Sequence, residues 1–207
     1  MKVLDGAVFL DVGGHDGATL EEAVKWTEFK TVHSFEPMQR EYTQLTKKFG
    51  HYPHVHLHNY GLADATGVQS MYGTNDLHDA SLLPGHHMSD QSVRTPCDFV
   101  EASEWFEQYI SDGDIVLAKF NCEGSEVAIL NNLIDTGAIW KISNAMIDWD
   151  CTRVFDGLQH LEQETIARFN SIGFEQGKRW FPCNQVMHGV THQDRIANWI
   201  REAAKVV

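Results

Sequence analysis

The sequence is poor in positive charge. Lysine and arginine together number 16, against 29 aspartates and glutamates, which leaves a formal net charge of −13 at pH 7. Nucleic acids and anionic membrane surfaces are bound through clusters of basic residues. We therefore expect neither nucleic acid nor a membrane surface as a partner.

Long hydrophobic runs, paired cysteines and linker segments are also missing. No stretch approaches the roughly 20 apolar residues of a membrane span, and the N-terminal M-K-V-L-D-G has no extended apolar core, so we expect neither a span nor a signal peptide. The four cysteines, Cys97, Cys122, Cys151 and Cys183, form no C-x-x-C pair, which favours free thiols in a reducing cytoplasm. Without a Pro-, Gly- or Ser-rich linker, the sequence predicts one domain over residues 1–207.

The stretch V-F-L-D-V-G-G-H-D-G-A-T, residues 8–19, predicts a buried strand that runs into a glycine-rich turn and then a helix. Glycines there allow positive φ and bring bare N–H groups near a ligand. Thr19 and Glu22 have the spacing of a capping box that starts a helix at Leu20. The turn lacks both G-x-G-x-x-G and a phosphate-gripping G-K-[ST], so a pyrophosphate is not the expected ligand. Asp11, at the strand end, is placed to receive a cationic amino group; the alternative is a plain strand-to-helix turn.

A second strand, Thr31 to Glu36, ends in a carboxylate before Pro37. In open α/β sheets an acidic residue in this place accepts hydrogen bonds from ribose hydroxyls. Taken alone, Glu36 is an ordinary loop carboxylate; together with the glycine turn it predicts a ribose site.

Further along the chain, apolar patterns predict alternating strands and helices. Strands are expected at 55–58, 115–120, 144–148, 174–180 and 184–188, the last two as a hairpin with one antiparallel strand. Helices are expected from Met38 to Phe49, around Phe99 to Tyr109 with Asp98 and Glu101 as capping pair, from Ser125 to the stop at Gly137, over 158–172, and around 196–203. Residues 65–94 show no sustained period and are expected to be irregular, either a substrate loop or surface disorder.

Lys119 lies inside the apolar run 115–120, where a lysine is costly unless it is paired. Glu123 and Glu126 are the nearby carboxylates. Their pairing with Lys119 would serve the site or only fix the loop.

Twelve histidines raise the question of a metal. His54, His56 and His58 alternate along one strand, and His86 and His87 are adjacent in the irregular segment. No H-E-x-x-H or paired C-x-x-C accompanies them, so we do not expect a metal site.

Four segments in order, D-V-G-G-H-D-G, S-F-E-P, N-Y-G-L-A-D and K-F-N-C-E-G-S-E, resemble the FkbM family of S-adenosylmethionine-dependent methyltransferases over about the first 150 residues. The resemblance implies a class I methyltransferase fold. This is a Rossmann-like α/β three-layer sandwich, whose mostly parallel seven-stranded sheet has one antiparallel strand near the C-terminus.

The resemblance also implies S-adenosylmethionine as cofactor and assigns residues to its parts. The methionine part falls on Asp11, Gly13 and Gly17, with Gly14, His15 and Asp16 completing the turn. The ribose falls on Glu36, followed by Pro37, and the adenine falls on Asn59 to Leu62, including Gly61. The family's K-x-D-x-E-G-x-E stretch falls on Lys119, Asn121, Glu123, Gly124 and Glu126. Asn121 stands where the family usually has aspartate, so a base or metal-ligand role is not carried over to it.

These observations predict an O-methyltransferase acting on a hydroxyl of a sugar, a glycan or a related small polar acceptor. Glu123 is the expected base or acceptor-orienting group, Lys119 would order the carboxylates, and Asn121 would hydrogen-bond the acceptor. The alternative is a non-catalytic protein of the same fold that binds a nucleoside or a partner. An NAD-dependent sugar-modifying enzyme is disfavoured by the missing G-x-G-x-x-G.

Overall fold

The computed structural model describes residues 4–73, 80–85, 93–150, 155–183 and 191–207. Its central feature is a six-stranded sheet in the order β3-β2-β1-β7-β8-β9, in which every pair of neighbours is parallel. The strands are β1 (Ala7–Val12), β2 (Phe29–Phe35), β3 (Val55–His58), β7 (Val116–Phe120), β8 (Asn144–Ile147) and β9 (Trp180–Pro182). The strands expected at 8–12 and 55–58 are confirmed, and those expected from 31, 115 and 144 agree to within two residues.

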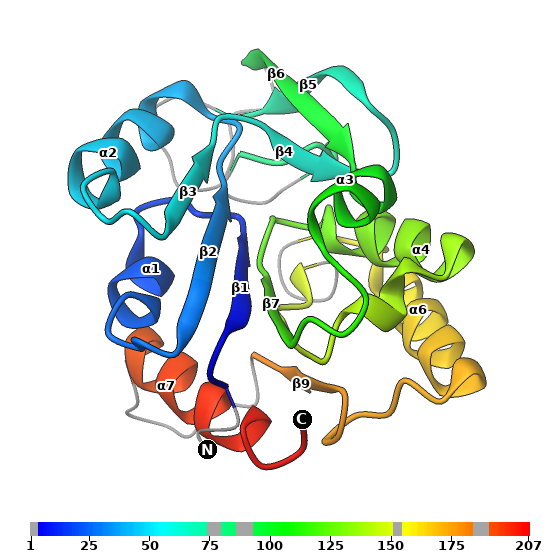
Figure 1. Cartoon of the computed structure of the whole chain (residues 1–207). Helices are drawn as coiled ribbons and strands as arrows, with labels where there is room; N and C mark the ends of the chain where they lie inside the picture. The colour runs from blue at the N-terminus through cyan, green and yellow to red at the C-terminus, as the bar shows by residue number, and fades with distance from the viewer. Residues whose placement is uncertain (1–3, 74–79, 86–92, 151–154, 184–190) are drawn as a thin grey trace.

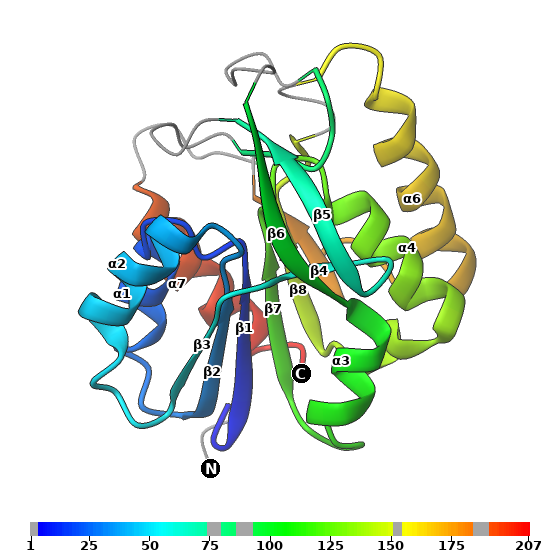
Figure 2. The same cartoon turned by 90° about the horizontal axis from the view of Figure 1, so that it is seen from above.

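Helices cover both faces of this sheet and give the expected three layers (Figures 1 and 2). On one face lie α1 (Ala18–Ala23), α2 (Gln39–Phe49) and α7 (His192–Ala203). On the other lie α3 (Ala102–Tyr109), α4 (Glu126–Thr136) and α6 (Gln159–Ile172), with a short 3-10 helix, η1 (Ala138–Lys141), after α4. The stops at Gly50, Gly137 and Gly173 are confirmed, the last two as left-handed caps with φ of 80° and 78°.

The alternation of side chains along β1 explains the two apolar layers. All six residues of β1 are buried. Val8, Leu10 and Val12 pack into the cluster formed with α3, α4 and α6, whereas Ala7 and Phe9 pack against α1, α2 and α7. A strand buried on both faces reads as a continuous apolar run, which is why this one is recognisable in the sequence.

A second, three-stranded sheet corrects the expectation for residues 65–94. It consists of β4 (Gly61–Ala63), β6 (Arg94–Glu101) and β5 (Gly67–Tyr72), in the order β4-β6-β5, with β5 antiparallel to β6. The segment is therefore partly regular, and residues 74–79 and 86–92 lie outside the described residues. The helix expected around Phe99 begins only at Ala102, because Phe99 belongs to β6.

The C-terminal hairpin expected from the sequence is not confirmed. Residues 174–179 do not form the expected strand; β9 begins at Trp180 and pairs parallel to β8. The strand expected at 184–188, and with it any antiparallel seventh strand, lies outside the described residues.

The two expected capping pairs are wrong. Helix α1 begins at Ala18 with Gly17 as its N-cap, and Glu22 accepts hydrogen bonds from Lys25 Nζ and Trp26 Nε1. Helix α3 has Glu101 as its N-cap without a side-chain cap. Glu101 Oε1 accepts from the side chains of Ser103 and Asn132 and not from a backbone N–H of the first turn.

The remaining general expectations concern thiols and membrane spans. Cys97, Cys122 and Cys183 are free thiols, as expected, and Cys151 lies outside the described residues. Among the described residues, no helix combines the length and the apolar character needed to cross a membrane.

Two of the three alternating histidines, His56 and His58, form an aromatic stack with His33. The His33 ring on β2 stacks on those of His56 and His58, at centroid distances of 4.9 and 5.3 Å, and Trp105 packs edge-on against His33. His33 Nδ1 lies 3.0 Å from His58 Nε2, a hydrogen bond between neutral rings. Within the described ranges no three His, Cys, Asp or Glu side chains are grouped to hold a metal; residues 86–87 lie outside those ranges.

Burial of this stack predicts a loss of stability in acid. Burial, together with neighbouring histidines, lowers the pKa of His33 to about 3 and that of His58 to about 4, from 6.5. Between pH 6.5 and 4 the unfolded chain therefore binds more protons than the folded one, and the free energy of unfolding falls as pH falls, by up to about 1.4 kcal/mol per pH unit for each group.

Urea unfolding at pH 7 and pH 4.5 checks this expectation. His33→Phe cannot be protonated and should lose less stability between the two pH values than the wild type. His160→Phe, at an exposed position on α6, is the control. Equal pH dependence of wild type and His33→Phe would contradict the assignment.

Candidate functional site

A cavity of about 430 Å³ opens at the carboxyl ends of β1, β2, β7 and β8, where ligands bind in open α/β sheets. Most of the site residues expected from the sequence line it. These are Gly13, Gly14, His15, Asp16, Glu36, Pro37, Gly61, Leu62, Lys119, Asn121 and Glu123. The structure thus brings together four segments that are far apart in the sequence.

Three expected cofactor residues, Asp11, Gly17 and Asn59, do not line the cavity. Gly17 caps α1, and a Cβ there would meet the Phe49 ring at 2.4 Å, so its place is fixed by packing. Asn59 donates from its side chain to Gln39 Oε1. Gly17 and Asn59 thus have structural roles outside the cavity wall.

Asp11 is fully buried and pairs with Lys119. The Lys119 Nζ lies 3.0 Å from Asp11 Oδ1 and 2.8 Å from the Gly13 carbonyl oxygen, and Ser34 Oγ donates to Asp11 Oδ2. Burial works against the ammonium, but the charge and hydrogen bond of Asp11 outweigh it and raise the pKa of Lys119. The expected partners Glu123 and Glu126 are therefore wrong, and Asp11 serves this pair rather than a ligand's amino group.

The N–H groups of the glycine turn are largely used within the protein. Gly13 and Gly14 both donate to the Phe35 carbonyl, Gly17 donates to the Gly14 carbonyl, and His15 donates to Glu36 Oε2. The expected row of bare N–H groups is therefore wrong. A turn satisfied in this way does not form the anion-binding nest on which phosphates rest.

Glycine at position 13 is required by a neighbouring loop. Gly13 has φ of 90°, and a Cβ built on it would stand 1.8 Å from the carbonyl oxygen of Asn121. The loop after β7 therefore lies directly on the glycine turn, and the two segments form one wall of the cavity.

Glu36 is buried at the end of β2. Its two carboxylate oxygens accept hydrogen bonds from the N–H groups of His15 and Met38, each at 2.8 Å. Burial raises the pKa of Glu36 to about 7, although these two N–H groups act in the opposite sense. A fixed carboxylate that faces the cavity is suited to accept hydrogen bonds from ligand hydroxyls.

The loop after β7 is held from beneath by two buried carboxylates. Glu126 accepts from the N–H groups of Gly124 and Asp150, and Asp150 Oδ2 accepts from the N–H of Glu123. Burial and the Asp150 charge raise the pKa of Glu126 well above its usual range. Glu126 is thus a support for the loop and not the partner of Lys119.

Backbone strain gathers at this cavity. Among the described residues only His15 and Glu123 are non-glycine residues with positive φ, at 44° and 51°, and both line the cavity. Such conformations are costly and cluster at functional sites, where the surrounding structure enforces them.

The Asn121 side chain presents a hydrogen-bond acceptor that has no donor among the described residues. Its Oδ1 is buried and receives no hydrogen bond from the described residues. A buried, unsatisfied acceptor costs about 1–3 kcal/mol, which a ligand hydroxyl or amino group would recover. The amide is therefore suited to orient a ligand and cannot act as a base.

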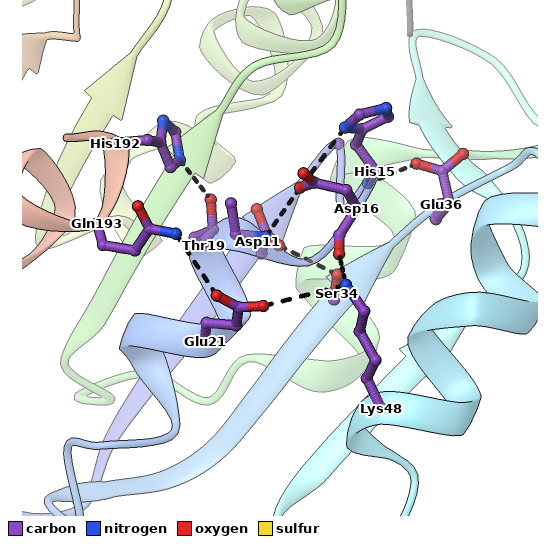
Figure 3. Close-up of polar contacts among 12 residues, drawn as sticks. Asp11, His15, Asp16, Thr19, Glu21, Ser34, Glu36, Lys48, His192 and Gln193 are labelled. Carbon is purple, nitrogen blue, oxygen red and sulfur yellow. Dashed lines mark hydrogen bonds and ion pairs between the residues drawn. The ribbon is translucent and has the colours of Figure 1, made fainter. Parts of the chain in front are cut away.

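Sequence reasoning missed the contribution of α7. Its His192 and Arg195 line the cavity, and His192 Nε2 lies 3.1 Å from the Thr19 hydroxyl on α1. Figure 3 shows the His192 and Thr19 side chains pointing toward each other. Beside this contact Gln193 reaches Glu21 of α1. The only sequence signal was the helix itself, since nothing in its pattern indicates which face meets the cavity.

Of three comparisons with known proteins, two found no match. No protein-family model matches the chain, and no curated protein matches it. Among solved structures, a methyltransferase FkbM from Methylobacillus flagellatus KT is similar, with 17% sequence identity and a TM-score of 0.41 over 68% of this chain. The chain spans about a third of that protein, 33% of its length. The chemistry of the cavity must therefore be inferred from its own residues.

Proposed function

We propose that this chain is an S-adenosylmethionine-dependent O-methyltransferase that acts on a hydroxyl of a sugar, a glycan or a related small polar molecule. The observation that carries this proposal is the character of the cavity. Five carboxylates line it, those of Asp16, Glu36, Glu41, Glu123 and Asp148, against two cations, Lys119, which is paired with Asp11, and Arg195 at the α7 end. A carboxylate-rich cavity without a phosphate cradle suits a cationic nucleoside free of phosphate.

The residues present fit such a cofactor at its nucleoside end. Glu36 offers a carboxylate for ribose hydroxyls. Beside it, Leu62, Met71 and Phe99 give the cavity an apolar surface for a flat base. Pro37 and Gly61 complete this end, next to the second sheet.

The NAD alternative fits less well. A dinucleotide pyrophosphate needs free N–H groups at the glycine turn and a helix N-terminus. Here Gly13, Gly14, His15 and Gly17 donate within the protein, and the Ala18 N–H at the start of α1 donates to Asp16 Oδ1. Asp16 would also repel a phosphate.

When bound, the cofactor would supply a methyl group already activated by the positive charge on its sulfur. The protein then has to align an acceptor hydroxyl and accept its proton. Asn121 Oδ1 is proposed to orient the acceptor by accepting a hydrogen bond from a neighbouring hydroxyl, and the Glu123 carboxylate is proposed to take the proton of the reacting hydroxyl. The Asp11–Lys119 pair holds the turn that faces them. Lys119 is thus a positioning residue.

A non-catalytic nucleoside-binding protein is the second candidate. It is favoured by one observation, the amide of Asn121 in place of a carboxylate. This candidate shares the Glu36 site with the first and differs from it in having no turnover.

Replacement of Glu36 tests the nucleoside end. Glu36→Gln should weaken binding of S-adenosylhomocysteine about 10- to 100-fold, because the ribose hydroxyls lose a charged acceptor. Since the pKa of Glu36 is about 7 and the ionised form is the better acceptor, wild-type affinity should rise from pH 6 to pH 8.

Titration calorimetry at both pH values measures this effect. Glu164→Gln, an exposed site on α6, should bind like the wild type. If Glu36→Gln binds as tightly as the wild type at pH 8, Glu36 is not part of the site.

A further inference from the structure

The first turn of α7 forms a rigid wall at one end of the cavity. Thr191 caps the helix in a capping box with Asp194. Beyond this turn Ile196, Trp199 and Ile200 are buried in the core, and Trp199 Nε1 donates to Asn144 Oδ1 at 2.7 Å. The side chains that this turn directs into the cavity are therefore held in place.

Arg195 is the cation of this wall, and the described residues leave most of its hydrogen-bonding capacity unused. Its Nε is buried and has no hydrogen-bond acceptor, and Nη1 has only the Cys183 sulfur, at 4.0 Å. A guanidinium carries five N–H donors, so an arrangement with one weak acceptor leaves most of them for a ligand.

Neighbouring groups in the described residues do not neutralise Arg195. Burial raises the pKa of Cys183 to about 11, so the sulfur beside the guanidinium is a neutral thiol. Asp194 is exposed and engaged in the cap of its own helix. None of the ion pairs formed by the described residues includes Arg195.

His192 stands on the same face of the helix, one turn before Arg195, and adds a neutral polar group. Burial, with the charges of Lys119 and Arg195, lowers the pKa of His192. Its ring is fixed by the Thr19 hydroxyl. The pair thus combines one fixed cation with one neutral ring, which is suited to an anion of single charge.

The position of Arg195 and His192 relative to Glu36 determines which part of a bound ligand can contact them. Glu36 follows β2, whereas Arg195 lies against Cys183, whose N–H donates to the Ile147 carbonyl at the end of β8. Strands β1 and β7 separate β8 from β2. At about 4.8 Å between neighbouring strands, the two strand ends lie roughly 14 Å apart. An extended ligand whose ribose is held at Glu36 therefore directs its other end, or its reaction partner, toward α7.

We propose that Arg195, with His192 beside it, binds a carboxylate at the α7 end of the cavity. The inference rests on the proposed function and deepens it. The carboxylate belongs either to the amino-acid part of the cofactor or to an acidic acceptor such as a sugar acid. In both cases the planar guanidinium fork matches the two carboxylate oxygens, which a lysine at this position would not do.

Calorimetry with two nucleosides tests the first source. S-adenosylhomocysteine carries the amino acid, and methylthioadenosine lacks it. If the carboxylate is the cofactor's, Arg195→Met should weaken S-adenosylhomocysteine about 10- to 100-fold and leave methylthioadenosine unchanged. Arg195→Lys should recover only part of the loss. Arg201→Met, the same change at an exposed position of α7, should change neither affinity.

Methyl transfer to a matched pair of sugars, glucuronic acid and glucose, tests the second source. If the carboxylate is the acceptor's, the wild type should prefer the acid and Arg195→Met should lose that preference with unchanged S-adenosylhomocysteine affinity. The inference is overturned if Arg195→Met binds both nucleosides like the wild type and the wild type shows no preference for the acid. If the wild type binds neither nucleoside, the proposed function itself has failed, and this inference fails with it.

Discussion

Replacement of Glu123 by glutamine is expected to lower turnover by about 10²- to 10⁴-fold, the range lost when a general base is removed. Glutamine keeps the size and the hydrogen-bonding reach of the side chain but cannot take a proton from an acceptor hydroxyl. The affinity for S-adenosylhomocysteine should change little, because the proposed nucleoside site is formed by Glu36 and the apolar residues near it and not by Glu123. Single-turnover methyl transfer on an accepted substrate measures the effect across pH.

The Glu123 experiment also separates the enzyme from the non-catalytic binder. Glu164→Gln serves as control and should transfer methyl groups at the wild-type rate. A Glu123→Gln protein as fast as the wild type would remove Glu123 as base. Absence of any turnover in the wild type, with normal nucleoside binding, would support the binder.

Replacement of Lys119 by methionine is expected to cost about 3–5 kcal/mol of unfolding free energy. The large effect follows from what remains, since Asp11 would be buried with only Ser34 Oγ, among the described residues, as a hydrogen-bond donor, and the Gly13 carbonyl would lose the Lys119 donor. Because an isolated buried carboxylate is more easily protonated, the deficit should shrink as pH is lowered. Urea unfolding at pH 7 and pH 5 measures both effects.

Two further variants complete the Lys119 experiment. Lys119→Met combined with Asp11→Asn removes the buried charge and should recover part of the lost stability. Lys205→Met, an exposed lysine near the C-terminus paired with Glu202, should change stability by less than about 1 kcal/mol. A loss that small for Lys119→Met would show that the pair is not a structural support.

The middle of the central sheet could be predicted from the sequence because β1, β7 and β8 are buried along their whole length, and glycines end three of the helices. The second sheet could not. Phe99, Ala102, Phe106 and Tyr109 have helical spacing, yet Phe99 alternates with Cys97 as the inward face of β6. Along β5 only Met71 is fully buried and Val68 is 69% exposed, so the strand shows no clear apolar period.

The site could be predicted where neighbours in sequence are neighbours in space, as for Glu36 and Pro37 or Asn121 and Glu123. The partner of Lys119 could not, because it depends on the register of parallel strands. Pairing of β1 with β7 places Asp11 directly opposite Lys119, across more than 100 residues of chain. Arg195 was missed for the same reason, since its role depends on where α7 packs.

The contact between α1 and α7 also sets the time at which the protein acquires its cavity during synthesis. The contact between the Thr19 hydroxyl and His192 cannot form until His192 has been synthesised, 173 residues later in the chain. At about 5–20 residues per second, a ribosome needs roughly 9–35 s to make that interval. The nascent chain can form β1, the glycine turn and β2 long before the wall that carries Arg195 exists. A ligand that needs both ends of the cavity therefore cannot bind to the growing chain. The N-terminal half of the cavity has to remain folded, or be protected, without stabilisation by a bound ligand until α7 has been synthesised.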